Sequence, residues 1–589
     1  MRGEAGFQDA RIEPPPTGGA VGVGFDRWFH AQIGHATAGV SPAALLLAYT
    51  DWLAHLMLSP GKQLGLQHEA LRTLASFALY LPRAVDSKEP WSVEPDARDH
   101  RFADPAWREW PYNLVAQSFL SMQRWWHAAM TDVRGVERHH ENVVDFVTRQ
   151  QLDVFAPSNF VPTNPEVLQR TWQTFGANLA HGWMNFWDDV RRQYSGAPVA
   201  GAESYRIGVN VAATPGKVVM RNELAELIQY APATAKVYPE PVLIVPAWIM
   251  KYYLLDLQAQ DSLVKYLVDQ GHTVFCVSWK NPGGAERELG LEDYLRLGVY
   301  ESLDAVRTIV PGCKIHAMGY CLGGTLLAIA AAAMARDGDE RLATMSLLAT
   351  ETDFSEPGEI ALFIDNSEVS FLEDIMFDRG FLERGEMAGA FELLRSNDLI
   401  WSRAVREYLI GERARLTGLM FWNQDSTRMP YRMHSQYLRR MFLNNDLAAA
   451  RFPAGGKPVA LSDVALPIFC LGTETDHVAP WRSVYKIHLL NDGEITFVLT
   501  KGGHNTGVVC PPGSPGRNYR IYVRPDEGKY IAPDQYLARA ETRDGSWWGE
   551  WQAWLARRSQ AVASPPTLGA PGTPYAPQAD APGRYVFER

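Results

Sequence analysis

The sequence is poor in cysteine, has no long hydrophobic run and carries no excess of positive charge. Five cysteines in 589 residues, with no Cys-x-x-Cys spacing, exclude a disulfide framework and a zinc site built from cysteine pairs. The longest nearly apolar stretch covers residues 323–335, which is shorter than the roughly 18 residues that a membrane-spanning helix requires. Lysine and arginine number 56 against 67 aspartates and glutamates. We therefore expect no transmembrane span and no nucleic-acid partner.

Signals for secretion and for cofactors are also missing. The first residues lack a basic segment followed by an apolar one, so we expect no secretory signal and, with reduced cysteines, a cytoplasmic protein. No Walker motif occurs, and Gly22-Val23-Gly24 lacks the third glycine of a dinucleotide-binding loop. His139 and His140 are adjacent and would point in different directions on a helix, which favours a solvated face over a metal site. The sequence thus predicts no bound cofactor and no metal.

The composition that is present, 46% hydrophobic and 21% charged, is that of a globular protein with a large core. Residues 1–24 are rich in glycine and proline and predict a disordered lead-in. Over residues 25–205 apolar side chains recur at three- and four-residue spacing, which predicts a helical N-terminal domain. Residues 206–560 predict an α/β catalytic domain, and residues 561–589 form a C-terminal tail rich in proline, alanine and glycine.

Within the catalytic domain, short apolar runs alternate with helical segments. This pattern is typical of a mostly parallel sheet with helices on both faces, and the predicted strands cover residues 242–245, 272–279, 314–318, 345–348, 468–471 and 495–499. The alternation stops over residues 353–462, which are polar, helical and rich in arginine and aromatic residues. An insertion at the carboxyl edge of a sheet predicts a lid over the active site; a passive helical elaboration is the alternative.

The most informative motif is GYCLGG at residues 319–324, between a predicted strand and a predicted helix. Glycines on both sides of a central nucleophile form the nucleophile elbow of the α/β-hydrolase fold, where the central residue is usually serine. Here it is Cys321, and no Gly-x-Ser-x-Gly occurs elsewhere. The helix N-terminus would stabilise a thiolate, and the backbone N–H of Leu322 would point at an oxyanion. A buried structural cysteine beside packing glycines is the alternative.

An acid and a base follow in the order that this fold requires. Asp476 comes after the strand at 468–471, and His504 comes after the strand at 495–499. His477 is the rival base and Glu474 the rival acid. We favour His504 because the last of these strands is followed by only one histidine.

Other candidate groups carry less information. The second oxyanion donor is expected in the loop after the strand at 242–245, where the backbone N–H of Ile249 is the candidate. Aromatic residues make up 11% of the chain, and tryptophans cluster at 547–554, which fits either a core or a protein that handles an apolar product. The four remaining cysteines are predicted to be small buried hydrophobes: Cys276, Cys313, Cys470 and Cys510.

At the elbow, at Asp476-His477 and at Gly503-His504, the sequence resembles the polyhydroxyalkanoate synthases, which polymerise 3-hydroxyacyl-CoA thioesters into a storage polyester. The resemblance runs from about residue 98 to the C-terminus. It includes RFADPAW at 101–107, KYYLLDL at 251–257, VSWKNP at 277–282, FWN at 421–423 and PGRYV at 582–586. Two positions depart from the family pattern: Met250 replaces a common asparagine, and His504 is followed by Asn505-Thr506 instead of an apolar residue.

The resemblance implies an acyltransferase. In such synthases the cysteine carries the growing chain as a thioester, the histidine deprotonates the thiol, and the aspartate helps to activate the incoming 3-hydroxyl; by motif these are Cys321, His504 and Asp476. It also implies a homodimer, a preference for short units such as (R)-3-hydroxybutyryl-CoA, free CoA as product, and association with nascent polyester granules. Two alternatives stay open: an acyl-CoA thioesterase with the same triad, and a weakly active granule-associated binding paralogue.

Overall fold

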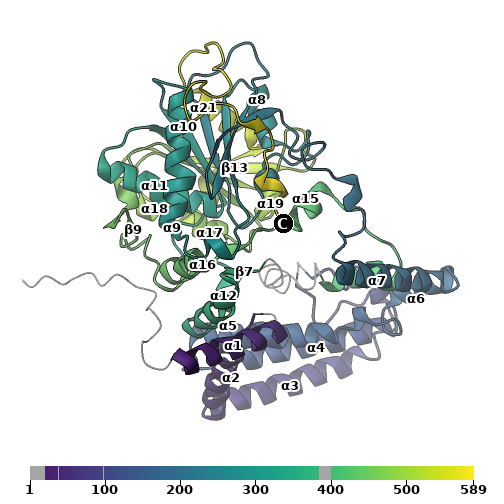
Figure 1. Cartoon of the computed structure of the whole chain (residues 1–589). Coiled ribbons are helices and arrows are strands. Elements are labelled where there is room, and N and C mark those ends of the chain that lie inside the picture. Colours follow the sequence, from purple (N-terminus) through teal and green to yellow (C-terminus); the bar gives the residue numbers. More distant parts are fainter. Residues whose placement is uncertain (1–19, 38, 97–98, 384–399) are drawn as a thin grey trace, which may run out of the picture.

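The computed structural model describes residues 20–37, 39–96, 99–383 and 400–589, and its largest element is a sheet of eleven strands (Figure 1). Six central strands run parallel in the order β4-β3-β5-β6-β11-β12. Antiparallel strands extend both edges, with β2, β1 and β15 beyond β4 and with β13 and β14 beyond β12. The strands are β1 Gly216–Arg221, β2 Ala225–Tyr230, β3 Val242–Val245, β4 Val274–Trp279, β5 Ile315–Tyr320, β6 Leu342–Leu348, β11 Ile468–Thr473, β12 Ile495–Thr500, β13 Asn518–Arg524, β14 Glu541–Asp544 and β15 Ala579–Asp580.

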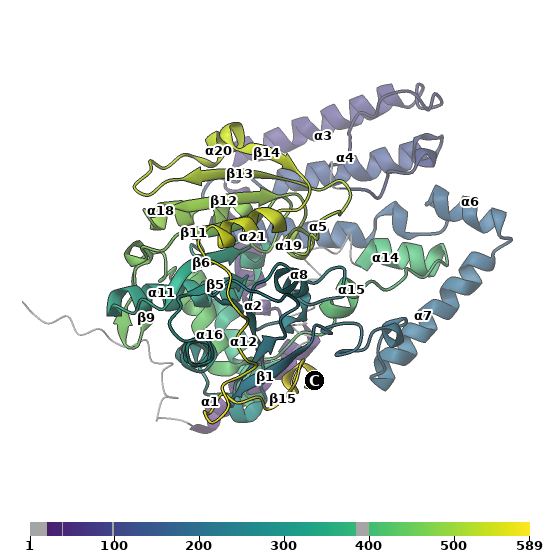
Figure 2. The same cartoon turned by 90° about the horizontal axis from the view of Figure 1, so that it is seen from above.

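All six strands predicted from apolar runs are present, and they form the parallel centre of this sheet. Five of them are buried along their whole length, as expected for strands covered on both faces: β3, β4, β5, β11 and β12. Helices α8 (Leu263–Asp269) and α21 (Trp548–Ala556) lie side by side on one face, while α10 (Glu301–Ile309) and α11 (Leu322–Asp337) cover the other (Figures 1 and 2). The predicted α/β-hydrolase fold is confirmed.

The longest apolar run of the sequence forms a buried helix of this domain. Every residue of α11 from Leu322 to Met334 is buried. Among the residues that the structure describes, no helix has both the length and the apolar character needed to cross a membrane.

Seven helices form the N-terminal domain below the sheet in Figure 1. They are α1 Ala20–Ala36, α2 Pro42–Met57, α3 Pro60–Tyr80, α4 Tyr112–Met130, α5 Arg138–Val154, α6 Pro165–Gln173 and α7 Ala177–Ser195. The first of them begins inside the predicted lead-in 1–24, so that prediction is wrong for its last five residues; residues 1–19 lie outside the described residues. Two small apolar clusters join four of these helices: the cluster around Trp107 includes residues of α3 and α4, and the cluster around Met130 includes residues of α2, α4 and α5. The domain therefore has no core as large as that of the sheet.

The inserted segment 353–462 lies between β6 and β11, and its residues 384–399 lie outside the described residues. Its elements include α12 Asn366–Arg379, β7 Phe381–Leu382, α15 Gly418–Asn423, β8 Met429–Pro430 and α16 Tyr431–Tyr437. The first and the last helix of the N-terminal domain both contact this segment (Figure 1). Helix α1 lies along α12, where Arg27 and His30 bind Asp374. Arg413 of the insertion binds Asp188 and Asp189 on α7. The insertion is thus packed between the helical domain and the sheet.

The C-terminal segment 561–589, predicted as a separate tail, is part of the catalytic domain. Its strand β15 pairs with β1, and Gln229 of β2 binds the backbone of Thr567 and Gly569. The buried carboxylate of Glu226, also on β2, accepts the backbone N–H groups of Arg584 and Tyr585. The division at residue 560 is therefore wrong, because the edge of the sheet and two buried polar side chains obtain their partners from this segment.

Candidate active site

The predicted nucleophile elbow is present between β5 and α11. Cys321 has φ 52° and ψ −125°, a conformation that non-glycine residues rarely adopt, and α11 begins at the next residue. A Cβ atom added to Gly319 would collide with the backbone of Gly324, and one added to Gly323 would collide with the carbonyl of Val245. The glycines of the motif are therefore required by the close approach of strand, turn and helix.

Asp476 and His504 lie beside this elbow, at the carboxyl ends of β11 and β12. Nδ1 of His504 lies 2.8 Å from Oδ2 of Asp476, and the Asp476 side chain is fully buried. Asp476 also accepts the backbone N–H groups of Val478 and Ala479 and the hydroxyl of Thr473, each at 2.9 Å. These donors satisfy the carboxylate and fix its position against the imidazole.

The electrostatics of the site favour a protonated imidazole. Burial alone would lower the pKa of His504, but the charges of Asp476 and Cys321 and hydrogen bonding to both outweigh it, so this pKa lies well above its ordinary value. Burial raises the pKa of Asp476, whereas His504 and the other donors lower it, and the net direction is down. A histidine that readily takes up the thiol proton and an ionised aspartate behind it are the pair that a cysteine nucleophile needs.

The rival residues are placed elsewhere. His504, and not His477, makes the hydrogen bond to Asp476, while the carbonyl of His477 accepts a backbone N–H from Glu359 in the inserted segment. Glu474 is exposed to solvent. The geometry thus brings together the three residues favoured from the sequence.

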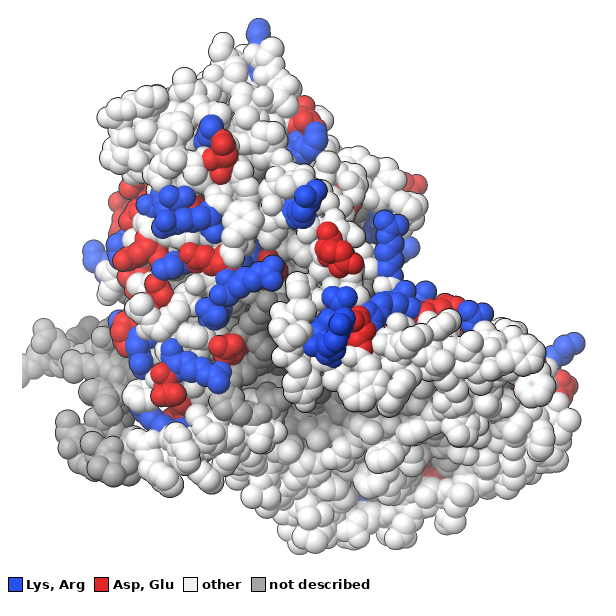
Figure 3. All heavy atoms as spheres, turned by 45° about the vertical axis from the view of Figure 1, so that its right-hand side comes forward, with Lys and Arg blue, Asp and Glu red and all other residues white. Residues whose placement is uncertain are grey.

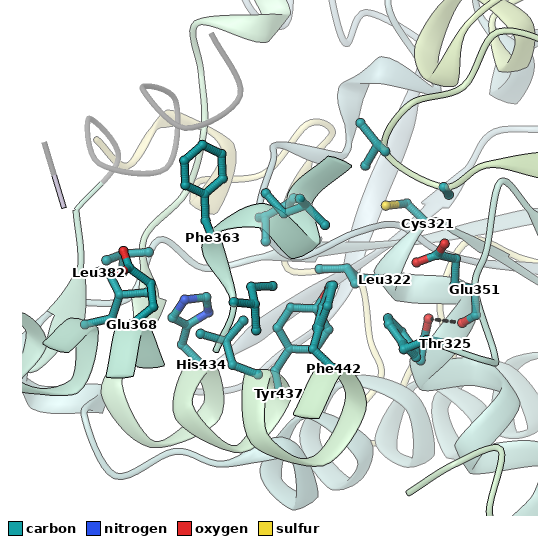
Figure 4. Close-up of a pocket in the computed structure, with 18 of the residues that line it drawn as sticks. Cys321, Leu322, Thr325, Glu351, Phe363, Glu368, Leu382, His434, Tyr437 and Phe442 are labelled. Atoms are coloured by element: carbon teal, nitrogen blue, oxygen red, sulfur yellow. Dashed lines mark hydrogen bonds between the residues drawn. The ribbon is translucent and has the colours of Figure 1, made fainter. Parts of the chain in front are cut away.

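Cys321 opens into a cavity lined largely by apolar side chains (Figure 4). Both predicted oxyanion residues, Leu322 and Ile249, line this cavity with it. Leu322 is the first residue of α11, so its N–H has no partner within the helix. The backbone after β3 is held by the insertion, since the carbonyls of Trp248 and Ile249 accept the hydroxyl and the N–H of Thr427.

The wall of the cavity is formed mainly by three parts of the chain: the N-terminal domain, the elbow and the insertion. The N-terminal domain provides Gly39 and Val40, and the elbow provides Cys321 and Leu322. Most of the remainder comes from the insertion: Phe354, Ile360, Phe363, Ile364, Leu372, Leu382, Tyr437, Leu438 and Phe442. The insertion therefore covers the nucleophile, as the predicted position of a lid requires.

The residues that depart from the family pattern, Met250 and Asn505-Thr506, all contact other residues in the structure. Asn505 accepts a hydrogen bond of 2.6 Å from the hydroxyl of Tyr320, whose ring packs against His504 with centroids 5.4 Å apart. Thr506 accepts the backbone N–H of Gly503 at 3.0 Å. Met250 forms an isolated bridge with Ser426 of the insertion. The contact of Tyr320 with His504 could not be predicted from the sequence, because an aromatic residue in an apolar strand cannot be distinguished from a core residue.

The tryptophan cluster at 547–554 belongs to the core and supports the helix that begins at His504. Trp547 and Trp548 donate to the carbonyls of Gly507 and Val508, at the end of α19 (His504–Val508). Trp551 and Trp554 donate to Ser346 of β6 and Thr496 of β12. All four are buried, so this cluster does not form an apolar surface. Of the other cysteines, Cys276, Cys470 and Cys510 are buried as predicted, while Cys313 is half-buried.

Comparison with known proteins agrees with this geometry. Family models for the N-terminal part of poly-beta-hydroxybutyrate polymerase match residues 98–267 and 23–62, and the alpha/beta hydrolase fold model matches residues 240–509. The poly(3-hydroxyalkanoate) polymerase of Methylorubrum extorquens is 39% identical over 84% of this chain and 81% of its own. The poly(3-hydroxyalkanoate) polymerase subunit PhaC of Cupriavidus necator is 33% identical over 99% of this chain and 97% of its own.

These matches extend the resemblance seen in the sequence. The resemblance seen in the sequence begins at about residue 98, but the match at 23–62 covers most of α1 and α2, and the alignment with the Cupriavidus necator protein covers nearly the whole chain. The ranges matched by the two family models thus include most of α1 and all of α7, two helices that contact the insertion. The chain belongs to the poly(3-hydroxyalkanoate) polymerase family.

Proposed function

We propose that this protein is a polyester synthase that polymerises 3-hydroxyacyl-CoA, with (R)-3-hydroxybutyryl-CoA as the preferred substrate, and releases CoA. The observation that carries the proposal is a cysteine at the nucleophile elbow, next to a buried Asp476–His504 pair and below an apolar cavity. Relatives that share 33–39% of their residues with this chain are named poly(3-hydroxyalkanoate) polymerase. No cofactor is needed for this reaction, because the CoA thioester is already activated.

In the first step His504 takes the proton of the Cys321 thiol, and the thiolate attacks the thioester carbonyl of the substrate. The C–S bond to CoA breaks, and the departing CoA thiolate is protonated by His504, which leaves the acyl group on Cys321. We assign stabilisation of the oxyanion to the backbone N–H groups of Leu322 and Ile249, which border the same cavity. The exchange of one thioester for another is nearly balanced in energy, so it suits a cysteine better than a serine.

In the second step the 3-hydroxyl of another unit attacks the acyl carbonyl on Cys321. Its proton passes to the His504–Asp476 pair, an ester bond forms, and the Cys321 thiolate is released for the next transfer. Each cycle thus forms one ester bond and releases one CoA. Asp476 supports this step most, because an alcohol is a far weaker acid than a thiol and needs a stronger base.

We propose that the apolar wall favours transfer of the acyl group over its hydrolysis. Phe354, Tyr437 and Phe442 from the insertion line the cavity with Cys321, and a largely apolar wall offers few polar groups that could hold an attacking water (Figure 4). The thioesterase alternative is not favoured. We propose that the insertion 353–462 acts as a lid whose movement admits substrate and the growing chain.

Incubation of the purified protein with (R)-3-hydroxybutyryl-CoA tests the function. CoA release and polymer mass should rise together, with about one CoA for each ester unit. Release of free 3-hydroxybutyrate in place of polymer would identify a thioesterase, and the absence of any turnover would favour the binding paralogue. Sedimentation of the same protein measures whether it is the homodimer that we propose.

We further propose that the N-terminal helices bind the surface of the polyester granule. The helical domain shows few charged side chains on the face seen in Figure 3. Large apolar side chains are exposed on α2 and α3: Leu46, Leu47, Leu53, Met57, Leu64, Leu71, Leu74 and Leu79. A surface of this kind fits a water-insoluble polyester, and it would keep the active site close to its product.

The double variant Leu71→Glu/Leu74→Glu should bind poly(3-hydroxybutyrate) particles at least about tenfold more weakly, because two charges replace apolar contacts worth roughly 1 kcal/mol each. The matched control is Leu489→Glu/Val562→Glu, which places the same charges at two exposed apolar positions of the catalytic domain. Co-sedimentation with particles measures both. Equal losses for the two double variants would show that α3 is not the contact.

A further inference from the structure

The wall near Cys321 contains an acidic side chain that the mechanism above does not use. The other polar side chain drawn at this end is Thr325, whose hydroxyl is already bonded to a backbone carbonyl, while the buried Glu368 and His434 lie at the opposite end of the cavity (Figure 4). Glu351 lies beside Cys321, and its carboxyl group is directed toward the nucleophile. A carboxyl group in such a place requires a partner, because burial of an unpaired polar group is costly.

The backbone holds Glu351 firmly next to the elbow. It follows β6, the strand adjacent to β5, and its carbonyl accepts a hydrogen bond of 2.8 Å from the hydroxyl of Thr325 on α11. The preceding residue, Thr350, donates to the carbonyl of Cys321 at 3.2 Å. These two hydrogen bonds connect the backbone around Glu351 to the elbow and to the first turn of α11. The backbone of Glu351 therefore has a fixed position relative to the sulfur of Cys321.

The side chain itself is 7% exposed, and its Oε1 is buried without a hydrogen-bond partner among the described residues. Burial and the nearby charges of Cys321 and Asp476 raise the pKa of Glu351 well above its ordinary value, against the opposing effects of Ser483 and His504. This direction favours the neutral carboxylic acid over the carboxylate. In that form it can donate one hydrogen bond into the cavity as well as accept one.

The proposed substrate brings a matching polar atom to the same place. When the acyl group is bound to Cys321, its 3-oxygen is attached to the second carbon after the carbonyl carbon. This oxygen then lies in a cavity lined largely by apolar side chains. We propose that Glu351 forms a hydrogen bond with the 3-oxygen of the acyl unit on Cys321, and so makes the site specific for 3-oxygenated acyl groups. This inference rests on the proposed polyester synthase function, since it assigns the recognition of that substrate.

The test compares two thioesters that differ only in this oxygen, 3-hydroxybutyryl-CoA and butyryl-CoA. Rapid-quench measurement of the first CoA released gives kcat/KM for acylation of Cys321 with each. Glu351→Leu should reduce the preference for the hydroxylated substrate by about 10- to 100-fold, mainly through loss with 3-hydroxybutyryl-CoA. Glu351→Gln should keep most of the preference, because an amide also donates a hydrogen bond.

Glu240→Gln is the matched control, since this buried glutamate lies outside the cavity and binds the backbone of Gln560. It should leave the preference unchanged. If Glu351→Leu does not fold, as judged by its melting curve, Glu351→Ala takes its place with the same expectation.

Two outcomes would overturn the inference. An equal loss with both substrates, together with a shifted pH profile, would show that Glu351 acts on His504 and not on substrate. If the wild-type enzyme forms polymer but shows no preference for the hydroxylated thioester, the proposed recognition of the 3-oxygen is refuted, while the proposed synthase function stands. By contrast, a wild-type enzyme acylated by neither thioester would refute the proposed function itself.

Discussion

Replacing Cys321 by alanine is expected to lower CoA release by roughly 10⁴-fold or more while the protein still folds. Cys321 stands at the elbow directly before α11, and its small buried side chain lines the cavity. Alanine fits the same backbone and removes only the nucleophile. The measurement is steady-state release of CoA from 3-hydroxybutyryl-CoA, with a melting curve to confirm the fold.

Cys510→Ala is the control for this experiment. Cys510 is also buried, but it lies away from the cavity wall, and its replacement should retain CoA release. Appreciable turnover by Cys321→Ala would show that another group attacks the thioester. Loss of turnover in folded Cys510→Ala would show that a second thiol takes part.

The second large effect is expected from His504 and Asp476, which should differ in the step that they damage. His504→Ala removes the group that accepts the proton in both steps, so acylation and elongation should each fall by about 10³-fold or more. Asp476→Asn keeps the size and the hydrogen bond but removes the charge that raises the pKa of His504. A weaker base still suffices for a thiol but not for an alcohol.

A rapid-quench experiment separates the two steps. Butyryl-CoA reports the first acylation only, because it carries no hydroxyl for elongation, and 3-hydroxybutyryl-CoA reports both the first and the later releases of CoA. For Asp476→Asn the later releases should fall at least about tenfold more than the first. Equal losses in the two phases would show that Asp476 only orients His504 and does not help to activate the hydroxyl.

The parallel strands and the nucleophile elbow can be predicted from the sequence because each has a pattern within a few consecutive residues. A parallel strand covered on both faces must be apolar along its length, which is why β3, β5 and β12 were found within two residues of their observed ends. The elbow was found for a similar reason: the turn leaves no room for side chains at Gly319 and Gly323. The order of acid and base then follows from the connection of the strands.

The edges of the sheet were missed because their pattern depends on distant parts of the chain. Strand β2 reads AELIQY, and Glu226 and Gln229 suggest an exposed or irregular segment, yet all six residues are buried. These two side chains are satisfied by the backbone of the C-terminal segment more than 330 residues away. A local pattern contains no information on such partners.

The sequence analysis also missed the buried glutamate in the cavity wall. Glu351 has no motif around it, and a glutamate just after a strand usually marks an exposed loop. It is buried nonetheless, in the wall of a cavity that Phe354 and Tyr437 of the insertion also line. Only the three-dimensional arrangement shows that its carboxyl group, with one oxygen left without a partner among the described residues, faces the nucleophile (Figure 4).

The central claim is that the growing polyester is bound to Cys321 as a thioester. Its most direct measurement is the mass of the peptide that contains Cys321, from protein quenched in acid within the first turnovers on 3-hydroxybutyryl-CoA. We expect that peptide to carry one or more 3-hydroxybutyryl units, removable by hydroxylamine, and the peptides of the other four cysteines to carry none. An unmodified Cys321 in protein that is actively forming polymer, or acyl units on a different residue, would contradict the claim.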